Sequence, residues 1–270
     1  MCPCMKRLAA LALAATLLPF TAVAEQLSDV VSATLRPGWR QADGTHVAAL
    51  QLRLAPGWKT YWRAPGDAGI PPEFDWSGSS NMDALSVTWP APHVFHRSGL
   101  RSVGYSDEVV LPLVVTARGG GDVRLGGEVR IGVCEDICLP ATLRVDGVLP
   151  ASATKPDPVI AAALAQRPFT EGEAGVGAVR CSISAGAGSG MGLRAEIEMP
   201  RLGSGEEIAI ETGNPAIWVD DPEASRIGDR LVAETRLEHV DGSAFALDRS
   251  AVRFTVMADG QAVDIRGCTG

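Results

Sequence analysis

The residues best suited to do chemistry are two cysteines separated by three residues, Cys134 and Cys138, in the segment CEDICLP at 134–140. A disulfide needs Cα atoms about 4.4–6.8 Å apart, which a tight turn can supply over this spacing and a straight strand cannot. Closing so small a loop removes little chain entropy, so the bridge would be a weak structural staple and a better candidate for repeated reduction and oxidation. Spacing alone leaves open whether the pair is redox-active or structural.

The residues between the two sulfurs indicate what kind of exchange the pair could perform. Glu135 and Asp136 place negative charge beside both thiols, and the sequence shows no helix N-terminus there. Both features should keep the pKa of the thiols from falling as it does in thioredoxin-like Cys-x-x-Cys sites. The pair therefore suits a relay with a docked partner: a partner thiolate attacks its disulfide, or its dithiol reduces the partner.

A zinc site is the chemical alternative for two nearby cysteines. Two thiolates need two further ligands, and the four histidines are His46, His93, His96 and His239. None has a zinc-finger spacing to the cysteines. We therefore expect no metal and no cofactor.

The remaining cysteines of the C-terminal part, Cys181 and Cys268, have a different spacing. A bridge between them would tie the first strand of this part to its last and close a loop of nearly ninety residues. The chain-entropy relation gives such a loop about 4 kcal/mol. We expect a structural disulfide, the alternative being a free thiol near the C-terminus.

The N-terminus has the pattern of a signal peptide over residues 1–24. Lys6 and Arg7 precede an apolar run over 8–18, and Ala22-Val23-Ala24 is a small-x-small cleavage site. The run is shorter than the roughly 20 apolar residues of a membrane-spanning helix, and no other stretch qualifies. We expect cleavage after Ala24, export to the periplasm and no integral membrane segment in the mature chain.

Removal of the signal peptide changes the cysteine count and the charge. Cys2 and Cys4 lie in it, precede a second possible start at Met5, and receive no role. Because the segment carries Lys6 and Arg7 and no acid, the net charge goes from −8 to −10. An acidic chain without a basic cluster argues against nucleic acid or anionic lipid as a partner.

The cysteine pair follows a predicted β-strand in a chain that has β patterns almost throughout. Apolar and polar residues alternate in several short stretches of the first half, the period of a half-buried strand. Pro112, inside one of them, indicates an edge strand or a bulge. The stretches are 47–54, 109–115, 128–133 and 143–148.

The composition changes near residue 150. Lys155-Pro156-Asp157-Pro158 is typical of a linker, and an alanine-rich helix is expected over 159–166, before Pro168. Further strands are expected at 195–199, 207–211, 231–237 and 252–257. The sequence predicts an all-β protein of two immunoglobulin-like β-sandwich domains joined by a short helical linker, with a redox domain at 25–152, the linker at 153–176 and a second sandwich at 177–270.

Several Trp, Pro and Gly patterns occur in the order of a known family. The segment GWKTYWRAPGDAG at 57–69 is similar to the Trp-x-x-Tyr-Trp-x-x-Pro-Gly-Asp-x-Gly signature of the periplasmic N-terminal region of DsbD-like disulfide reductases. Trp89-Pro90, Gly104-Tyr105, Leu111-Pro112 and Cys-x-x-x-Cys-x-Pro follow in the same order. Residues 30–150 thus resemble this family, and the three-residue spacing is closer to its ScsB branch.

The resemblance implies an immunoglobulin-like domain that takes electrons from a membrane-embedded partner and passes them to periplasmic thioredoxin-fold proteins. By the family's order, Cys138 forms the mixed disulfide with the partner and Cys134 resolves it. We expect Tyr61 and Phe95 to shield the pair. The residues expected to shape the site are Tyr61, Phe95, Glu135, Asp136 and Pro140.

The resemblance also has a limit. Family members continue into a transmembrane region and a thioredoxin-like domain, and this sequence shows neither, so we expect a separate membrane electron donor. One alternative is a non-catalytic periplasmic binding or chaperone module with two structural disulfides. A third hypothesis is a copper-tolerance factor, from the association of the ScsB branch with copper.

Overall fold

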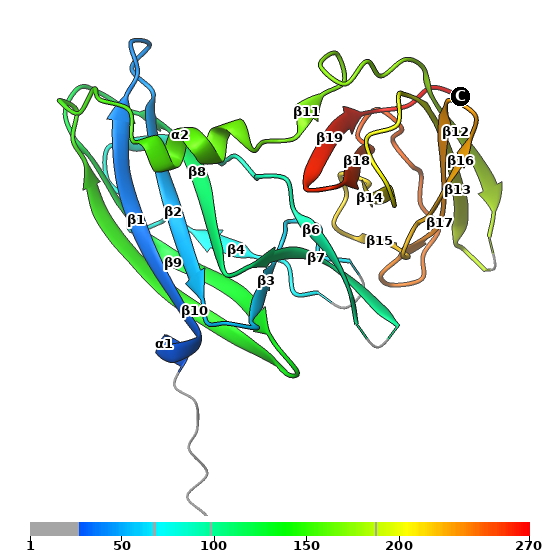
Figure 1. Cartoon of the computed structure of the whole chain (residues 1–270), viewed down its shortest axis with the longest axis horizontal. Helices are drawn as coiled ribbons and strands as arrows, with labels where there is room; N and C mark the ends of the chain where they lie inside the picture. Colours follow the sequence, from blue (N-terminus) through cyan, green and yellow to red (C-terminus); the bar gives the residue numbers. More distant parts are fainter. Residues whose placement is uncertain (1–26, 67–68, 98, 187) are drawn as a thin grey trace, which may run out of the picture.

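The structure is a computed structural model that describes residues 27–66, 69–97, 99–186 and 188–270. The expected signal peptide, with Cys2 and Cys4, lies outside the described residues, as do positions 67 and 68 of the Trp/Pro/Gly signature. The described chain forms two immunoglobulin-like β-sandwiches connected by a short helix, as the sequence predicted (Figure 1).

The N-terminal sandwich consists of two sheets that follow α1 (Leu27–Val30). The first has the order β1 (Val31–Arg40), β2 (His46–Leu54), β8 (Glu108–Ala117), β5 (Met82–Val87). The second has the order β10 (Cys138–Leu149), β9 (Val123–Cys134), β3 (Lys59–Tyr61), β7 (Leu100–Ser106), β6 (His93–Arg97), and β4 (Glu73–Asp75) also pairs with β9.

The C-terminal sandwich has the same two-layer plan. Its first sheet has the order β11 (Phe169–Thr170), β19 (Gln261–Arg266), β18 (Arg253–Ala258), β14 (Glu207–Glu211). Its second sheet has the order β12 (Val179–Ala185), β13 (Met191–Glu198), β17 (Arg230–His239), β15 (Ile217–Val219), and β16 (Glu223–Ile227) also pairs with β17. β11 lies within the segment expected as linker.

Alternation in the sequence explains the strand that carries the first cysteine. In β9, Val129, Ile131 and Val133 are buried in the core between the sheets, whereas Arg130 between them is exposed. Successive side chains of a strand point to opposite faces, so this pattern fixes which face of β9 meets the core. Residues 134–138 therefore follow a strand whose register is set by packing.

Pro112 lies in an interior strand, contrary to the edge position that the sequence indicated. It pairs with Ala49 of β2, and β8 lies between β2 and β5. Its carbonyl accepts a hydrogen bond from the amide of Thr88, just after the last residue of β5. The missing N–H faces the same side, just beyond the last residue pair of β5 and β8, which is Val87 and Leu113.

The connecting helix α2 (Pro158–Ala165) begins at a well-formed cap. Asp157 accepts hydrogen bonds from the amides of Val159 and Ile160, and Pro158 occupies the first turn, where an N–H is not needed. Ile160 and Ala163 are buried against β2 and β8. The helix is therefore packed on the first sandwich.

Buried arginines of the N-terminal sandwich bind the C-terminal one. The Arg101 guanidinium on β7 is 5% exposed and donates to Glu207 at 3.0 Å, to Asp221 at 2.9 Å and to the carbonyl oxygen of Ile208 at 2.8 Å. His96 on β6 also contacts Glu207, at 2.7 Å. The β6–β7 hairpin, which lies between the two sandwiches in Figure 1, is thus fixed to the C-terminal sandwich close to its turn, where His96 pairs with Arg101.

A second arginine contact continues this interface. Arg63, two residues after β3, donates to the Glu211 carboxylate at 2.9 Å and to the Thr255 hydroxyl at 3.3 Å. The N-terminal core cluster also includes three apolar residues of the C-terminal sandwich, Ala209, Met257 and Ala262. Arg63 and this apolar contact therefore extend the interface between the two sandwiches.

Candidate functional site

The cysteine pair lies in the turn between two antiparallel strands. Cys134 is the last residue of β9 and Cys138 the first of β10; they are paired in register, with Cα atoms 4.2 Å apart, and their sulfurs form a disulfide. Within the turn the Glu135 amide donates to the Ile137 carbonyl at 3.1 Å. This turn brings the sulfurs together without interrupting the ladder that continues at Leu139.

The two sulfurs differ in accessibility. Cys134 is 1% exposed, whereas Cys138 is exposed, and Ile137 beside it is 64% exposed. A thiol–disulfide exchange requires an incoming thiolate to reach one sulfur of the bond. Of the two cysteines, Cys138 is the more accessible from solvent.

The Tyr61 hydroxyl contacts both sulfurs, 2.8 Å from Cys134 Sγ and 3.3 Å from Cys138 Sγ. The ring is 4% exposed, and burial raises the pKa of the phenol. The hydroxyl is therefore protonated at neutral pH and is the donor, since disulfide sulfurs carry no hydrogen. Tyr61 lies where the sequence placed it, against the pair.

The acidic residues of the turn are bound by neighbouring groups. Arg97 at the end of β6 donates to the Glu135 carbonyl oxygen at 2.7 Å and forms an ion pair with Asp136. The Glu135 carboxylate lies over Gly57, where an added Cβ would come within 2.6 Å of Oε1. Gly57 has φ of +86°, a second reason for glycine at this position. The negative charge expected beside the thiols is thus partly balanced by a guanidinium.

Phe95 lies on β6, where its ring is 5.2 Å from the Lys59 ammonium. Lys59 also donates to the Ser102 hydroxyl at 2.9 Å. Lys59, Ser102 and Arg97 were not predicted from the sequence as residues of the site. The signal for Lys59 was its spacing of two from Tyr61, which puts both side chains on one face of β3; Ser102 and Arg97 are brought in by strand pairing, which has no local signal.

Pro140 is exposed and pairs with Gly132 of β9. β10 is the edge strand of its sheet, a position where a missing N–H is tolerated. Trp58 and Trp62 of the signature are 4% and 0% exposed and belong to the core beneath the site. These residues support the site from the strand and from the core.

The other two cysteines form a disulfide in the C-terminal sandwich. Cys181 on β12 is bonded to Cys268 after β19, with Cα atoms 5.7 Å apart and a sequence separation of 87. Cys181 is 3% exposed. The bond links the beginning and the end of this sandwich and lies in its core cluster.

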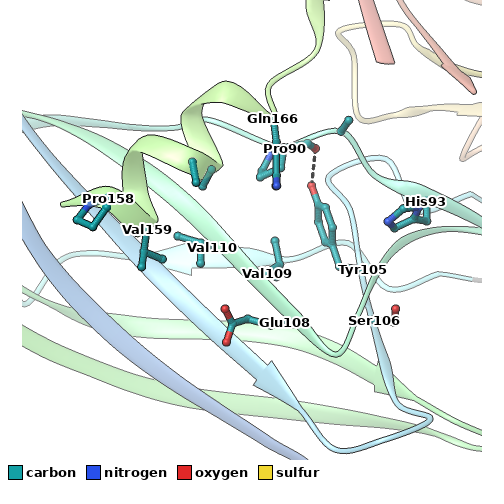
Figure 2. A pocket seen from close by; sticks show the side chains of 13 residues that line it. Pro90, His93, Tyr105, Ser106, Glu108, Val109, Val110, Pro158, Val159 and Gln166 are labelled. Atoms are coloured by element: carbon teal, nitrogen blue, oxygen red, sulfur yellow. Dashed lines mark hydrogen bonds between the residues drawn. The ribbon is translucent and has the colours of Figure 1, made fainter. Parts of the chain in front are cut away.

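A pocket of about 470 Å³ lies between α2 and β8 of the N-terminal sandwich (Figure 2). Pro90, Val109, Val110 and Val159 are among its lining residues, and neither cysteine is. The buried Tyr105 hydroxyl at its side donates to the Pro90 carbonyl at 2.9 Å. The chemistry of the sulfurs therefore belongs to the exposed turn and not to this pocket.

Neither a metal-binding cluster nor a membrane-spanning helix is present among the described residues. They contain no group of three or more His, Cys, Asp or Glu side chains placed to hold a metal ion. No helix among them has the length and hydrophobicity needed to cross a membrane.

The chain is similar to proteins of known family and of known structure. Residues 26–150 match the family described as thiol:disulfide interchange protein DsbD, N-terminal. The fold is similar to the crystal structure of the N-terminal periplasmic domain of ScsB from Proteus mirabilis, with a TM-score of 0.63 and 23% identity over 89% of this chain and 92% of that one. No curated protein sequence matches the chain significantly.

Proposed function

We propose that the protein relays electrons through Cys134 and Cys138, because residues 26–150 match the N-terminal domain family of the thiol:disulfide interchange protein DsbD. The observation that carries the proposal is the disulfide itself: an exposed sulfur bonded to a buried one, with the Tyr61 hydroxyl against both. A disulfide that joins residues only four positions apart adds little stability as a structural bridge. An exchange site, in contrast, needs one accessible sulfur.

The proposed exchange has a defined order. A donor thiolate attacks Cys138 Sγ, the bond between the two sulfurs breaks, and the electron pair leaves on Cys134 Sγ. A second donor thiol then attacks the mixed disulfide and releases Cys138 as a thiol, which leaves the donor oxidised and this protein reduced. In the next transfer Cys138 attacks the disulfide of an acceptor and Cys134 resolves the mixed disulfide.

We propose the periplasm as the compartment, a membrane-embedded reductase as donor and thioredoxin-fold proteins as acceptors. The signal-peptide pattern and the periplasmic ScsB domain support the compartment. The exposed Ile137 beside Cys138 supports recognition by docking, because an apolar side chain next to the attacked sulfur can be covered by a partner.

The reduction potential of the Cys134–Cys138 pair tests this function. It is measured by thiol trapping of the chain beginning at Glu25 across a series of redox buffers. A potential between about −180 and −270 mV, the range of exchange-active pairs, is expected. A potential below about −300 mV would make the bond a stable structural bridge and favour the binding-module alternative.

Partner trapping tests the order of the two cysteines. A Cys134→Ala variant is expected to accumulate a mixed disulfide with a thioredoxin-fold protein, because the resolving thiol is missing. The matched Cys138→Ala variant is expected to accumulate none, because its remaining thiol is buried. Equal trapping by the two variants would contradict the assigned order.

A further inference from the structure

Lys59 stands directly opposite Cys134 in the sheet. The two residues are register partners in the antiparallel pair of β3 and β9. Cβ atoms of such partners are about 4.5–5.5 Å apart, and both side chains leave the same face of the sheet. Tyr61, two residues along β3, shares this face, and its contact with Cys134 Sγ shows which face it is.

Two neutral groups hold the Lys59 ammonium. It donates to the Ser102 hydroxyl at 2.9 Å, and the Phe95 ring lies 5.2 Å away, within the range of a cation–π contact. Among the described residues, no carboxylate lies within ion-pair distance of it. Burial and then the Arg97 charge lower the pKa of this half-buried ammonium. Its charge is therefore not neutralised by a pair of its own.

The other charged groups around the cysteines are arranged differently. Arg97 forms an ion pair with Asp136, and the Glu135 carboxylate lies over Gly57. His93 on β6 is exposed. Lys59 is thus the cation opposite the buried sulfur, and Arg97 the cation that balances the turn.

We propose that Lys59 stabilises the thiolate that forms on Cys134 whenever the disulfide opens. The inference rests on the proposed function, in which Cys134 Sγ takes the electron pair of the broken bond. No proton has to move in that step. A charge at a site 1% exposed is costly unless a hydrogen bond and an opposite charge compensate it. Tyr61 supplies the hydrogen bond and Lys59 supplies the charge.

The consequence is kinetic as well as thermodynamic. A thiol of lower pKa leaves faster in thiol–disulfide exchange, so a cation beside Cys134 speeds the attack on Cys138. The same cation increases the thiolate fraction of Cys134 in the reduced protein, and the thiolate is the form that resolves a mixed disulfide. Lys59 thereby acts on both directions of transfer without touching the partner.

The ionisation of Cys134 tests the proposal directly. In a Cys138→Ser chain beginning at Glu25, Cys134 is the single free thiol, and selective ¹³Cβ labelling of cysteine follows its titration by NMR. Lys59→Met is expected to raise the pKa of this thiol and to lower its thiolate fraction at pH 7 about fivefold. Lys59→Arg is expected to retain most of the thiolate, because it keeps the charge.

The matched control is Lys155→Met, which removes the other lysine of the described chain at an exposed linker position. It is expected to leave the titration unchanged. An unchanged titration in Lys59→Met would overturn the proposal, even if that variant were less stable, because the lysine charge would then have no effect on the ionisation of Cys134. Equal thiolate loss in Lys59→Arg and Lys59→Met would overturn it too.

A second readout separates this proposal from the proposed function. The disulfide-bonded chain is reduced with dithiothreitol, and the rate is compared between the wild type and Lys59→Met. A slower rate in the variant, by about fivefold, supports the role of Lys59. A wild-type disulfide that resists reduction would refute the relay itself, whereas equal fast rates in both proteins would refute only the role of Lys59.

Discussion

Removing each disulfide in turn should show that the two bonds stabilise the fold to very different degrees. The sequence separations are 4 for Cys134–Cys138 and 87 for Cys181–Cys268. In the chain-entropy relation the stabilisation grows with the logarithm of loop length, so this ratio gives a difference of about 2.7 kcal/mol. We expect loss of the long bond to cost about 4.6 kcal/mol in free energy of unfolding, and loss of the short one about 2 kcal/mol.

The variants are the double substitutions Cys134→Ser with Cys138→Ser and Cys181→Ser with Cys268→Ser. Each pair has one sulfur in a core, Cys134 at 1% and Cys181 at 3% exposure, so the cost of burying a serine hydroxyl largely cancels in the comparison. Urea unfolding followed by circular dichroism gives the free energies by linear extrapolation. If removal of the short bond proved as costly as removal of the long one, Cys134–Cys138 would be a staple and the reasoning would be refuted.

Three further predictions concern the surroundings of the pair. Tyr61→Phe should slow reduction of the disulfide by dithiothreitol about tenfold, since a hydrogen bond to the charged thiolate that forms on Cys134 contributes about 1.5 kcal/mol. An unchanged rate in stopped-flow measurements would contradict this prediction. Arg101→Met should lower the free energy of urea unfolding by about 2–3 kcal/mol, because two half-exposed carboxylates lose a buried partner. Arg124→Met breaks an exposed ion pair and should cost less than about 1 kcal/mol. Equal costs for the two variants would show that the buried ion pairs of Arg101 do not stabilise the fold more than a surface pair does. Hydrogen bonds from Arg167 and from Thr170 lower the pKa of Glu173 from 4.5 to about 2, so its contribution to folding stability is complete above pH 4.5 and is lost as the pH falls toward 2. The free energy of unfolding of Glu173→Gln should therefore fall less steeply than that of the wild type over this pH interval. Identical pH dependence in the two proteins would exclude the contribution of Glu173.

The sequence predicted those parts of the fold that carry a local pattern. Alternation in 128–133 and 143–148 indicated the two strands that flank the cysteine turn, and Asp157-Pro158 preceded the helix where it was expected. β3 and β6 were not predicted, because they are short and their side chains are selected by contacts across the sheet. Local alternation needs more residues than a three-residue strand provides.

The sequence predicted only some of the residues around the cysteine pair. The family resemblance predicted that Tyr61 and Phe95 shield the cysteines; Tyr61 contacts both sulfurs, and Phe95 contacts Lys59 and His93. Lys59 and Arg97 were missed because each reaches the turn through strand pairing between distant segments. The boundaries proposed for the two domains stay a prediction.

The β6–β7 hairpin is attached unevenly, and this determines how it can move. Close to its turn, Arg101 is buried against two carboxylates of the C-terminal sandwich, whereas Arg97, in the next register pair, contacts the cysteine turn at the surface. A surface ion pair contributes only about 0–1 kcal/mol, so thermal energy can release Arg97 from the cysteine turn while Arg101 keeps its buried contacts. The C-terminal sandwich therefore holds this end of the hairpin in place, and a partner that approaches Cys138 has to displace only the Arg97 side chain.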